Sequence, residues 1–485
     1  MNSRCFEVIT FMLIISVRPA VATPLHILLI VVDDLGWSDV GFHNPQINTP
    51  NLDHLASEGV ILDNYYVQPI CTPTRAALLT GLYPIHTGMQ KGVLHQKQPY
   101  GLPLRFTTLS QKLKEAGYST HIIGKWHLGF FRWPYTPLYR GFDSFYGFYG
   151  GYEDYYSHEN EGILDLLDNK KPVRDKSGVY SATLYAEQAR RVILSHNTSK
   201  PLFLYLPFQS VHGPLSVDLK YEEKYRGIRN KARRTHAGMV DIMDEAIGNV
   251  TEAMKEAGLW NETLTIITTD NGGNLDKGGY NWPLRGQKTD LWEGGVRGVG
   301  LVHGTIFQKT GVKCKELLHV TDWYPTLVNL AERSLGKRRT HATIPQLDGF
   351  NIWRSISEGA PSPRKEILHN IIDQWAAIRV GDMKLILNQT DRERYIPPEL
   401  VGSIPAEQGK KGHCCKKVID VGLYNITADP YEIVDLSKQF PDIVEALMTR
   451  VEFYRQSAVP PENKPSESLA RITARMKGYW RPWKD

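Results

Sequence analysis

Cysteine is scarce in this chain, with five in 485 residues, one of them in the N-terminal leader. The others, Cys71, Cys314, Cys414 and Cys415, are too few for the dense disulfide framework of small secreted domains. Cys414 and Cys415 are adjacent, so each is expected to bond elsewhere, and Cys314 is a possible partner for one of them. A zinc finger is not expected, because the cysteine and histidine residues offer no two ligand pairs at finger spacing.

Long apolar runs are also lacking, because crossing a bilayer takes about 20 apolar residues and no run is that long. The N-terminus has the shorter pattern of a secretory signal, with Arg4, an apolar core over residues 8–17 and an Ala20-Val21-Ala22 cleavage motif. We therefore expect residues 1–22 to be a signal peptide, no membrane span, and a secreted or lysosomal protein. Five glycosylation sequons agree with that route: Asn197, Asn249, Asn261, Asn388 and Asn425.

Strong charge of one sign is absent too. The formal net charge is +5 and the sequence pI is about 8.7, which is too mild to indicate nucleic-acid binding. The basic stretch from Lys224 to Arg234 (KYRGIRNKARR) could guide a polyanion, and a solvated face is an equally good interpretation. No internal repeat and no low-complexity tract occurs. The length and the 41% hydrophobic content predict one large globular domain with a smaller one.

Four short apolar runs are each followed by polar residues. They are 25–32 (before Asp33-Asp34), 121–123 (before Lys125 and His127), 202–208 (before His212) and 264–269 (before Asp270-Asn271). Continuous apolar runs bounded by turn residues are typical of strands buried on both faces of a parallel sheet. Helical patterns at 108–116 and 237–258 alternate with them, which predicts an α/β domain with a large, mostly parallel sheet flanked by helices. In such sheets, ligands bind beyond the carboxyl ends of the strands.

The composition changes near residue 362. The stretch SEGAPSPRKE is rich in proline, serine and charge, and is typical of a connection. Short strand patterns follow, and residues 441–453 are expected to form a helix. We therefore predict a catalytic domain over residues 23–365 and a smaller α+β domain over residues 366–485.

Oxygen-bearing side chains end two of the predicted strands: Asp33 and Asp34 after the first, Asp270 and Asn271 after the last. Carboxylate and amide oxygens suit calcium or magnesium. Loop capping is the alternative, since Asp and Asn favour turns. Each pair alone favours capping, and the two together favour a metal.

Several cationic side chains are uninformative one by one. Lys125, His127, His212 and Lys288 each have an ordinary structural explanation, and Arg75 could be a solvated helix residue. They become candidate site residues only because three of them follow strands at the edge where the carboxylates are expected.

Cys71 opens the stretch CTPTRAALLTG. A helix is expected from Pro73 or Thr74 to Thr80, ending at Gly81, and its N-terminus would favour an anionic ligand near Cys71. A buried thiol, a disulfide and a cysteine protease are the alternatives. The protease has no role for calcium-type ligands.

The motif Cys71-Thr-Pro-Thr-Arg75 resembles the sulfatase signature C-x-P-x-R, followed by an L-L-T-G tail. The phrases AGYSTHIIGKWHLGF, NWPLRGQK and LWEGGVRGVG are most similar to the arylsulfatase B, I and J group. The resemblance implies an alkaline-phosphatase-like fold. It also implies that the formylglycine-generating enzyme oxidises Cys71 to formylglycine during secretion.

Carried to this sequence, the resemblance implies a complete site. Calcium would be bound by Asp33, Asp34, Asp270, Asn271 and the modified Cys71. Arg75 would hold the aldehyde hydrate and His127 would contact it, while sulfate would be bound by Lys125, His212 and Lys288. One hydroxyl of the hydrate would take the sulfuryl group and the other would expel it as sulfate. Two proton roles are hypotheses: His127 accepts the hydroxyl proton, and His212 protonates the leaving alkoxide.

The sequence therefore predicts a calcium-dependent sulfatase. Its expected substrate is a sulfated sugar, either N-acetylgalactosamine-4-sulfate-like at the end of a dermatan or chondroitin chain, or a small aryl or glycoside sulfate. A phosphatase or phosphodiesterase of the same superfamily is one alternative, and Cys71 argues against it. A catalytically silent protein that binds sulfated glycans is another, and the complete residue set argues against that.

Overall fold

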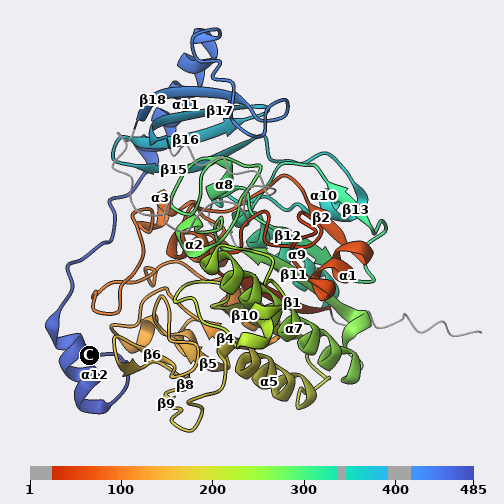
Figure 1. Ribbon diagram of the computed structural model, residues 1–485, viewed down its shortest axis with the longest axis vertical. Coiled ribbons are helices and arrows are strands. Elements are labelled where there is room, and N and C mark those ends of the chain that lie inside the picture. The colour runs from red at the N-terminus through yellow and green to blue at the C-terminus, as the bar shows by residue number, and fades with distance from the viewer. Residues whose placement is uncertain (1–24, 337–345, 392–416) are drawn as a thin grey trace, which may run out of the picture.

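The computed structural model describes residues 25–336, 346–391 and 417–485 (Figure 1). The predicted signal peptide and the Cys414-Cys415 pair lie outside these ranges. Within them, no helix has the length and apolar content needed to cross a membrane.

A ten-stranded sheet forms the centre of the larger part (Figure 1). Its strands, in spatial order, are β13 (Val312–Cys314), β2 (Val60–Leu62), β12 (Gly300–His303), β11 (Thr263–Thr269), β1 (His26–Val32), β10 (Leu202–Phe208), β4 (Ser119–Lys125), β5 (Ser144–Phe148), β8 (Leu167–Asp168) and β9 (Lys171–Pro172). The central run β11-β1-β10-β4-β5 is parallel. Every residue of β1, β10 and β11 is buried, so the predicted mostly parallel sheet is confirmed.

Helices cover both faces of this sheet. In β1, Ile27, Leu29 and Val31 join one hydrophobic core, while the alternate residues 28, 30 and 32 join the other, as the two-residue period of a strand requires. The first core includes α2 (Cys71–Thr80), α4 (Leu109–Ala116) and α9 (Trp323–Ser334), and the second includes α1 (Pro50–Glu58), α5 (Ser181–Leu194) and α7 (Lys231–Glu256).

Helix α2 begins earlier than predicted. Its first residue is Cys71, so the expected start at Pro73 or Thr74 is wrong. Proline is tolerated at the third position because the first N–H groups of a helix have no intrahelical partner. The predicted end is confirmed, since Gly81 adopts a left-handed φ of 70° and donates to the Ala77 carbonyl.

The N-termini of two other helices differ from the predicted ones. Thr108 is the N-cap of α4 and forms a reciprocal capping box with Gln111. Helix α7 begins at Lys231, six positions before the expected Ala237, because the Asn230 side chain accepts a hydrogen bond from the Arg233 N–H. The end of the basic stretch is therefore helical.

A four-stranded antiparallel sheet lies apart from the large one, as predicted for a smaller α+β unit. It contains β15 (Glu366–Ile372), β16 (Trp375–Val380), β17 (Met383–Thr390) and β18 (Val418–Asn425), with α11 (Pro441–Ser457) packed against it. The chain then returns along the large part to α12 (Ser468–Lys477) (Figure 1). Beyond that helix, Trp480 packs on Phe130. The domain limits at 365 and 366 stay predictions.

Shorter elements complete the fold. They are β3 (Tyr65–Tyr66), α3 (Pro84–Thr87), β6 (Glu159–Asn160), β7 (Ile163–Leu164), α6 (Leu219–Glu223), α8 (Glu293–Val296), β14 (Leu318–His319) and α10 (Trp353–Glu358).

Candidate functional site

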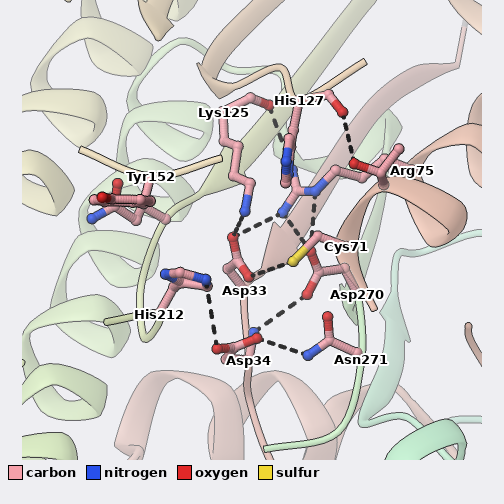
Figure 2. Close-up of polar contacts among 12 residues, drawn as sticks. Asp33, Asp34, Cys71, Arg75, Lys125, His127, Tyr152, His212, Asp270 and Asn271 are labelled. Carbon is pink, nitrogen blue, oxygen red and sulfur yellow. Dashed lines mark hydrogen bonds and ion pairs between the residues drawn. The ribbon is translucent and has the colours of Figure 1, made fainter. Parts of the chain in front are cut away.

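The polar residues that follow the central strands meet at one edge of the sheet (Figure 2). Asp33 and Asp34 follow β1, Asp270 and Asn271 follow β11, Lys125 ends β4, and His212 follows β10. Helix α2 brings Cys71 and Arg75 to the same place, and Lys288 reaches it from the loop before α8. The structure thus brings together residues that lie up to 255 positions apart in the sequence.

Cys71 lies directly beside the first carboxylate pair. Its Sγ is 3.6 Å from Oδ1 of Asp33. One ligand atom from each of Asp33, Asp34, Cys71 and His212 lies within 4.8 Å of the others, a spacing that could hold a metal ion.

Arg75 is fully buried between two carboxylates. Its Nε and Nη2 lie 3.0 and 2.7 Å from Oδ2 of Asp270, and Nη2 lies 3.3 Å from Oδ2 of Asp33. A buried guanidinium with two partners remains charged, and burial is offset here because Asp270 and Asp33 raise the pKa of Arg75.

Two lysines pair with the aspartates that follow β1. Lys125 contacts Oδ2 of Asp33, and the Nζ of Lys288 lies 2.6 Å from Oδ1 of Asp34. Burial alone would raise the pKa of both carboxyls, but these lysines and His212 outweigh it, so the pKa of each aspartate falls below its usual value. Both aspartates are therefore ionised at neutral pH.

Asn271 carries an unused acceptor at the site. Its Nδ2 donates to Oδ1 of Asp34 at 2.7 Å and to the Gly272 carbonyl. Its Oδ1 is buried and has no hydrogen-bond partner within the ranges that the structure describes. Buried polar atoms are almost always satisfied, so an orphan amide oxygen beside three carboxylates fits a hard cation such as calcium.

The unmodified thiol of Cys71 is a poor nucleophile. Burial, followed by the charge of Asp33, raises the pKa of Cys71 above its usual value. Reactive cysteines need a lowered pKa, because the thiolate is the attacking form. The site therefore does not support the cysteine-protease alternative.

His127 is held in one tautomer. Its Nε2 donates to the Leu94 carbonyl at 2.9 Å, which leaves Nδ1 as an acceptor, and Nδ1 is buried with no partner among the described residues. Burial and the nearby Lys125 and Arg75 charges hold the pKa of His127 well below its usual value. The ring is therefore neutral and can accept a proton at Nδ1.

His212 has the opposite tautomer. Its Nδ1 donates to the Gly213 carbonyl at 2.6 Å, and its Nε2 lies 4.0 Å from Oδ2 of Asp34. About a fifth of the side chain is exposed, whereas Arg75 and Lys125 are fully buried. His212 therefore lies at the mouth of the site, with Nε2 facing the carboxylates.

The Lys288 loop is held by the small sheet and by the segment that follows it. Arg285 donates to the Glu432 carbonyl at 2.9 Å, and the Glu293 N–H donates to the Glu432 side chain at 2.7 Å. The side chain of Trp292 donates to the Thr390 carbonyl of β17. The C-terminal part of the chain thus positions a lysine of the site, a relationship that sequence spacing does not reveal.

Sequence reasoning also missed Tyr152. Its ring stacks on the His212 imidazole with centroids 6.1 Å apart and 15° between the planes (Figure 2). The aromatic-rich stretch GGYEDYY was the available signal, but nothing in its spacing relates it to His212.

A large cavity of about 1110 Å³ lies away from these residues, at the other end of α2. Two of the arginines that line it already have partners, since Arg364 pairs with Asp322 and Arg450 with Glu366. The cavity contains none of the predicted site residues, and we place the chemistry at the strand ends.

The basic stretch is largely neutralised. Lys224 pairs with Asp241 at 2.5 Å, Arg234 pairs with Glu222, and Arg233 is buried against Asp39. Its role as a polyanion guide stays a prediction that rests on the exposed residues 226, 229 and 231.

The remaining predicted residues lie elsewhere on the molecule. Cys314 is buried, and both of its possible partners lie outside the described ranges, so that disulfide stays a prediction. The sequon asparagines are accessible to different degrees: Asn197, Asn249 and Asn261 are exposed, while Asn388 and Asn425 are half-buried.

Known proteins are similar to this chain in sequence and in fold. The family model described as Sulfatase matches residues 26–333. Arylsulfatase J of Mus musculus is 44% identical over 94% of this chain and 80% of its own length, and arylsulfatase A of Homo sapiens is 33% identical over 72% and 71%. The crystal structure of Ps i-CgsB in complex with k-i-k-neocarrahexaose is 28% identical, with a TM-score of 0.77 over 93% of this chain and 97% of that one.

Proposed function

The chain belongs to the sulfatase family of sulfuric ester hydrolases, and on that premise we propose that it desulfates sugars with a formylglycine made from Cys71 and a bound calcium ion. The observation that carries the proposal is the position of Cys71. It is the first residue of α2, its Sγ lies 3.6 Å from Asp33, and Arg75 and Lys125 lie around the same carboxylate.

The residues present fit a calcium ion. Asp33, Asp34, Asp270 and Asn271 would hold it, together with the oxygen that replaces the Cys71 sulfur. The orphan Oδ1 of Asn271 supports this assignment. When bound, the ion would polarise the sulfate and lower the pKa of the attacking hydroxyl.

The cations of the chain would bind the sulfate group. Lys125 pairs with Asp33 and Lys288 pairs with Asp34, and Arg75 also contacts Asp33. A preorganised positive charge in a site shielded from water stabilises the negative charge that develops on the transferred oxygens.

The two histidines would divide the proton transfers. His127 has a free acceptor in Nδ1 and would take the proton of the attacking hydroxyl. His212 lies at the mouth, and as the doubly protonated imidazolium it would give its Nε2 proton to the leaving alkoxide while its Nδ1 N–H stays bonded to the Gly213 carbonyl. A sulfate ester adds negative charge beside His212, which favours the imidazolium.

A sugar sulfate is the substrate class that this account favours. Two relatives support it by name: N-acetylgalactosamine-6-sulfatase of Homo sapiens, 30% identical over 69% of this chain, and the structure in complex with a neocarrahexaose. Oxidation of Cys71 by the formylglycine-generating enzyme would take place in the secretory pathway, which agrees with the predicted signal peptide and a secreted or lysosomal location.

The test is sulfate release from a panel of sulfated monosaccharides and a small aryl sulfate, with protein purified from a eukaryotic secretory host. The matched control is Cys71→Ala, which removes the nucleophile and changes no charge. We expect turnover by the wild type and none by the variant. Binding of sulfated sugars without turnover by either protein would favour the catalytically silent alternative, and turnover of phosphate esters alone would favour the phosphatase.

A further inference from the structure

The loop after β5 places Tyr152 at the mouth of the site. The residue is 39% exposed, and its ring lies against the His212 imidazole in an offset-stacked arrangement (Figure 2). Its hydroxyl has no hydrogen-bond partner among the residues that the structure describes. An exposed, unpartnered aromatic ring beside a candidate proton donor is available to a ligand.

Side-chain hydrogen bonds from two other parts of the chain hold the backbone at Tyr152 and Glu153. The Gln209 side chain accepts from the Glu153 N–H at 2.6 Å and donates back to the Glu153 carbonyl at 2.7 Å. The Asn160 side chain donates to the Tyr152 carbonyl itself. Because Gln209 lies three residues before His212, this reciprocal pair fixes the tyrosine loop against the histidine loop.

The same loop closes over both histidines. The Tyr155 hydroxyl donates to the His212 carbonyl at 2.8 Å. A Cβ built on Gly151 would lie 2.9 Å from Nε2 of His127, so the glycine backbone packs directly on that ring. The backbone that carries Tyr152 is therefore fixed beside both histidines, with the ring stacked on His212.

A lysine lies next to the loop that carries His212. Lys277, at the end of the turn Leu275–Lys277, packs its aliphatic carbons over Gly213, 3.5 Å from the position that a Cβ would take there. The lysine is exposed, and no carboxylate pairs with it within the described ranges. The residue after His212 is thus flanked by the side chain of an exposed lysine.

We propose that Tyr152 and Lys277 form a saccharide subsite beside His212, which selects the leaving group of the sulfate ester. The apolar face of a pyranose ring would pack on the Tyr152 ring, and Lys277 would pair with a second anionic group, a carboxylate or sulfate, of the same saccharide. This inference rests on the proposed function, because it deepens the sugar-sulfatase assignment.

The test compares KM for a sulfated N-acetylhexosamine with inhibition by inorganic sulfate, which reaches only the inner cations. Tyr152→Ala should raise KM about 5- to 10-fold, as the loss of one stacking contact does, and should leave the sulfate inhibition constant within about twofold. Tyr152→Phe should behave like the wild type, because the hydroxyl has no partner. The control is Tyr139→Ala, another exposed tyrosine, outside the site.

The charge is tested separately with Lys277→Gln. This variant should raise KM about 2- to 5-fold for a saccharide with a second anionic group and should leave KM for the monosulfated sugar unchanged.

Three results would overturn the inference. An unchanged KM in Tyr152→Ala would show that the ring does not contact the sugar. An equal rise of KM and of the sulfate inhibition constant would show that Tyr152 only supports the pocket. Wild-type turnover of aryl sulfate with none of any sulfated sugar would remove the proposed substrate and this subsite together, whereas the first two results leave the proposed function intact.

Discussion

Arg75 of α2 donates from Nε and Nη2 to a single oxygen, Oδ2 of Asp270, which lies 195 positions later in the chain. The pair is fully buried and joins the start of a helix to the end of a strand. Its geometry fixes α2, and therefore Cys71, relative to the carboxylates. The same arginine contacts Asp33, so one side chain connects both halves of the candidate metal site.

Loss of Arg75 should therefore weaken the fold as well as the chemistry. Arg75→Ala leaves two buried carboxylates without their guanidinium, which costs about 3–5 kcal/mol of unfolding free energy. Urea unfolding of the variant in the presence of a chelator measures this. The control, Arg354→Ala, removes an exposed ion pair and should cost under about 1 kcal/mol. Equal effects of the two variants would contradict the structural role.

Lys288 should matter for catalysis and for stability. Lys288→Ala removes one of the cations near the proposed sulfate position, and kcat/KM should fall about 10²- to 10³-fold. The free energy of unfolding should fall as well, because the variant leaves the buried Asp34 carboxylate without the lysine that pairs with it. The control is Lys255→Ala, at an exposed position on α7. Wild-type kinetics in Lys288→Ala would exclude Lys288 from sulfate binding.

Calcium should stabilise the native protein. A ligand that binds only the folded state adds about 2.7 kcal/mol at a hundredfold excess over its Kd. We expect a chelator to lower the thermal midpoint, added calcium to restore it, and Asn271→Ala to raise the calcium Kd at least about tenfold by removing one oxygen ligand. Thermal unfolding across a calcium titration checks this. A midpoint that is insensitive to calcium would contradict the metal assignment.

Acid should lower the free energy of unfolding, because it protonates Asp39. Burial alone would raise its pKa, but Arg233 and His236 outweigh burial and lower it from 3.8 to about 2. The folded pKa lies below the unfolded one, so the contribution is present above about pH 4 and is lost as the pH falls towards 2. This contribution of Asp39 to the free energy of unfolding amounts to about 2 kcal/mol.

Urea unfolding of Asp39→Asn against the wild type tests this sign. The difference in unfolding free energy should be largest near pH 6 and should shrink on acidification below pH 4. The exposed Asp442→Asn is the control and should show no such trend. A difference that grows as the pH falls would contradict the assignment.

The sequence predicted the core strands closely because burial on both faces leaves a direct pattern. The expected apolar run 202–208 coincides with β10, and 25–32 contains β1. The Asp33-Asp34 and Asp270-Asn271 pairs could be predicted as metal candidates for the same reason, since they follow those strands and parallel strands end at one edge. The sulfate-binding role of Lys288, which follows no predicted strand, was implied only by the resemblance to sulfatases. Helix starts were predicted less well, because a cap such as Asn230 is set by one local hydrogen bond.

The walls of the site could not be predicted. The Gln209–Glu153 pair joins residues 56 positions apart, and neither residue type signals the other. The Tyr152–His212 stack depends on that pair. The anchoring of the Lys288 loop likewise depends on Glu432, which reaches it from the C-terminal part of the chain.

The chemical state of Cys71 tests the central claim most directly. No lysine or arginine occurs between Thr23 and Arg75, so one tryptic peptide carries the predicted mature N-terminus, Asp33, Asp34 and Cys71. Its mass, with and without a thiol alkylator, should be measured on protein from a eukaryotic secretory host. We expect the thiol sulfur to be replaced by a carbonyl oxygen, with no alkylation. An intact, alkylatable thiol, from a host that modifies other sulfatases, would contradict the account.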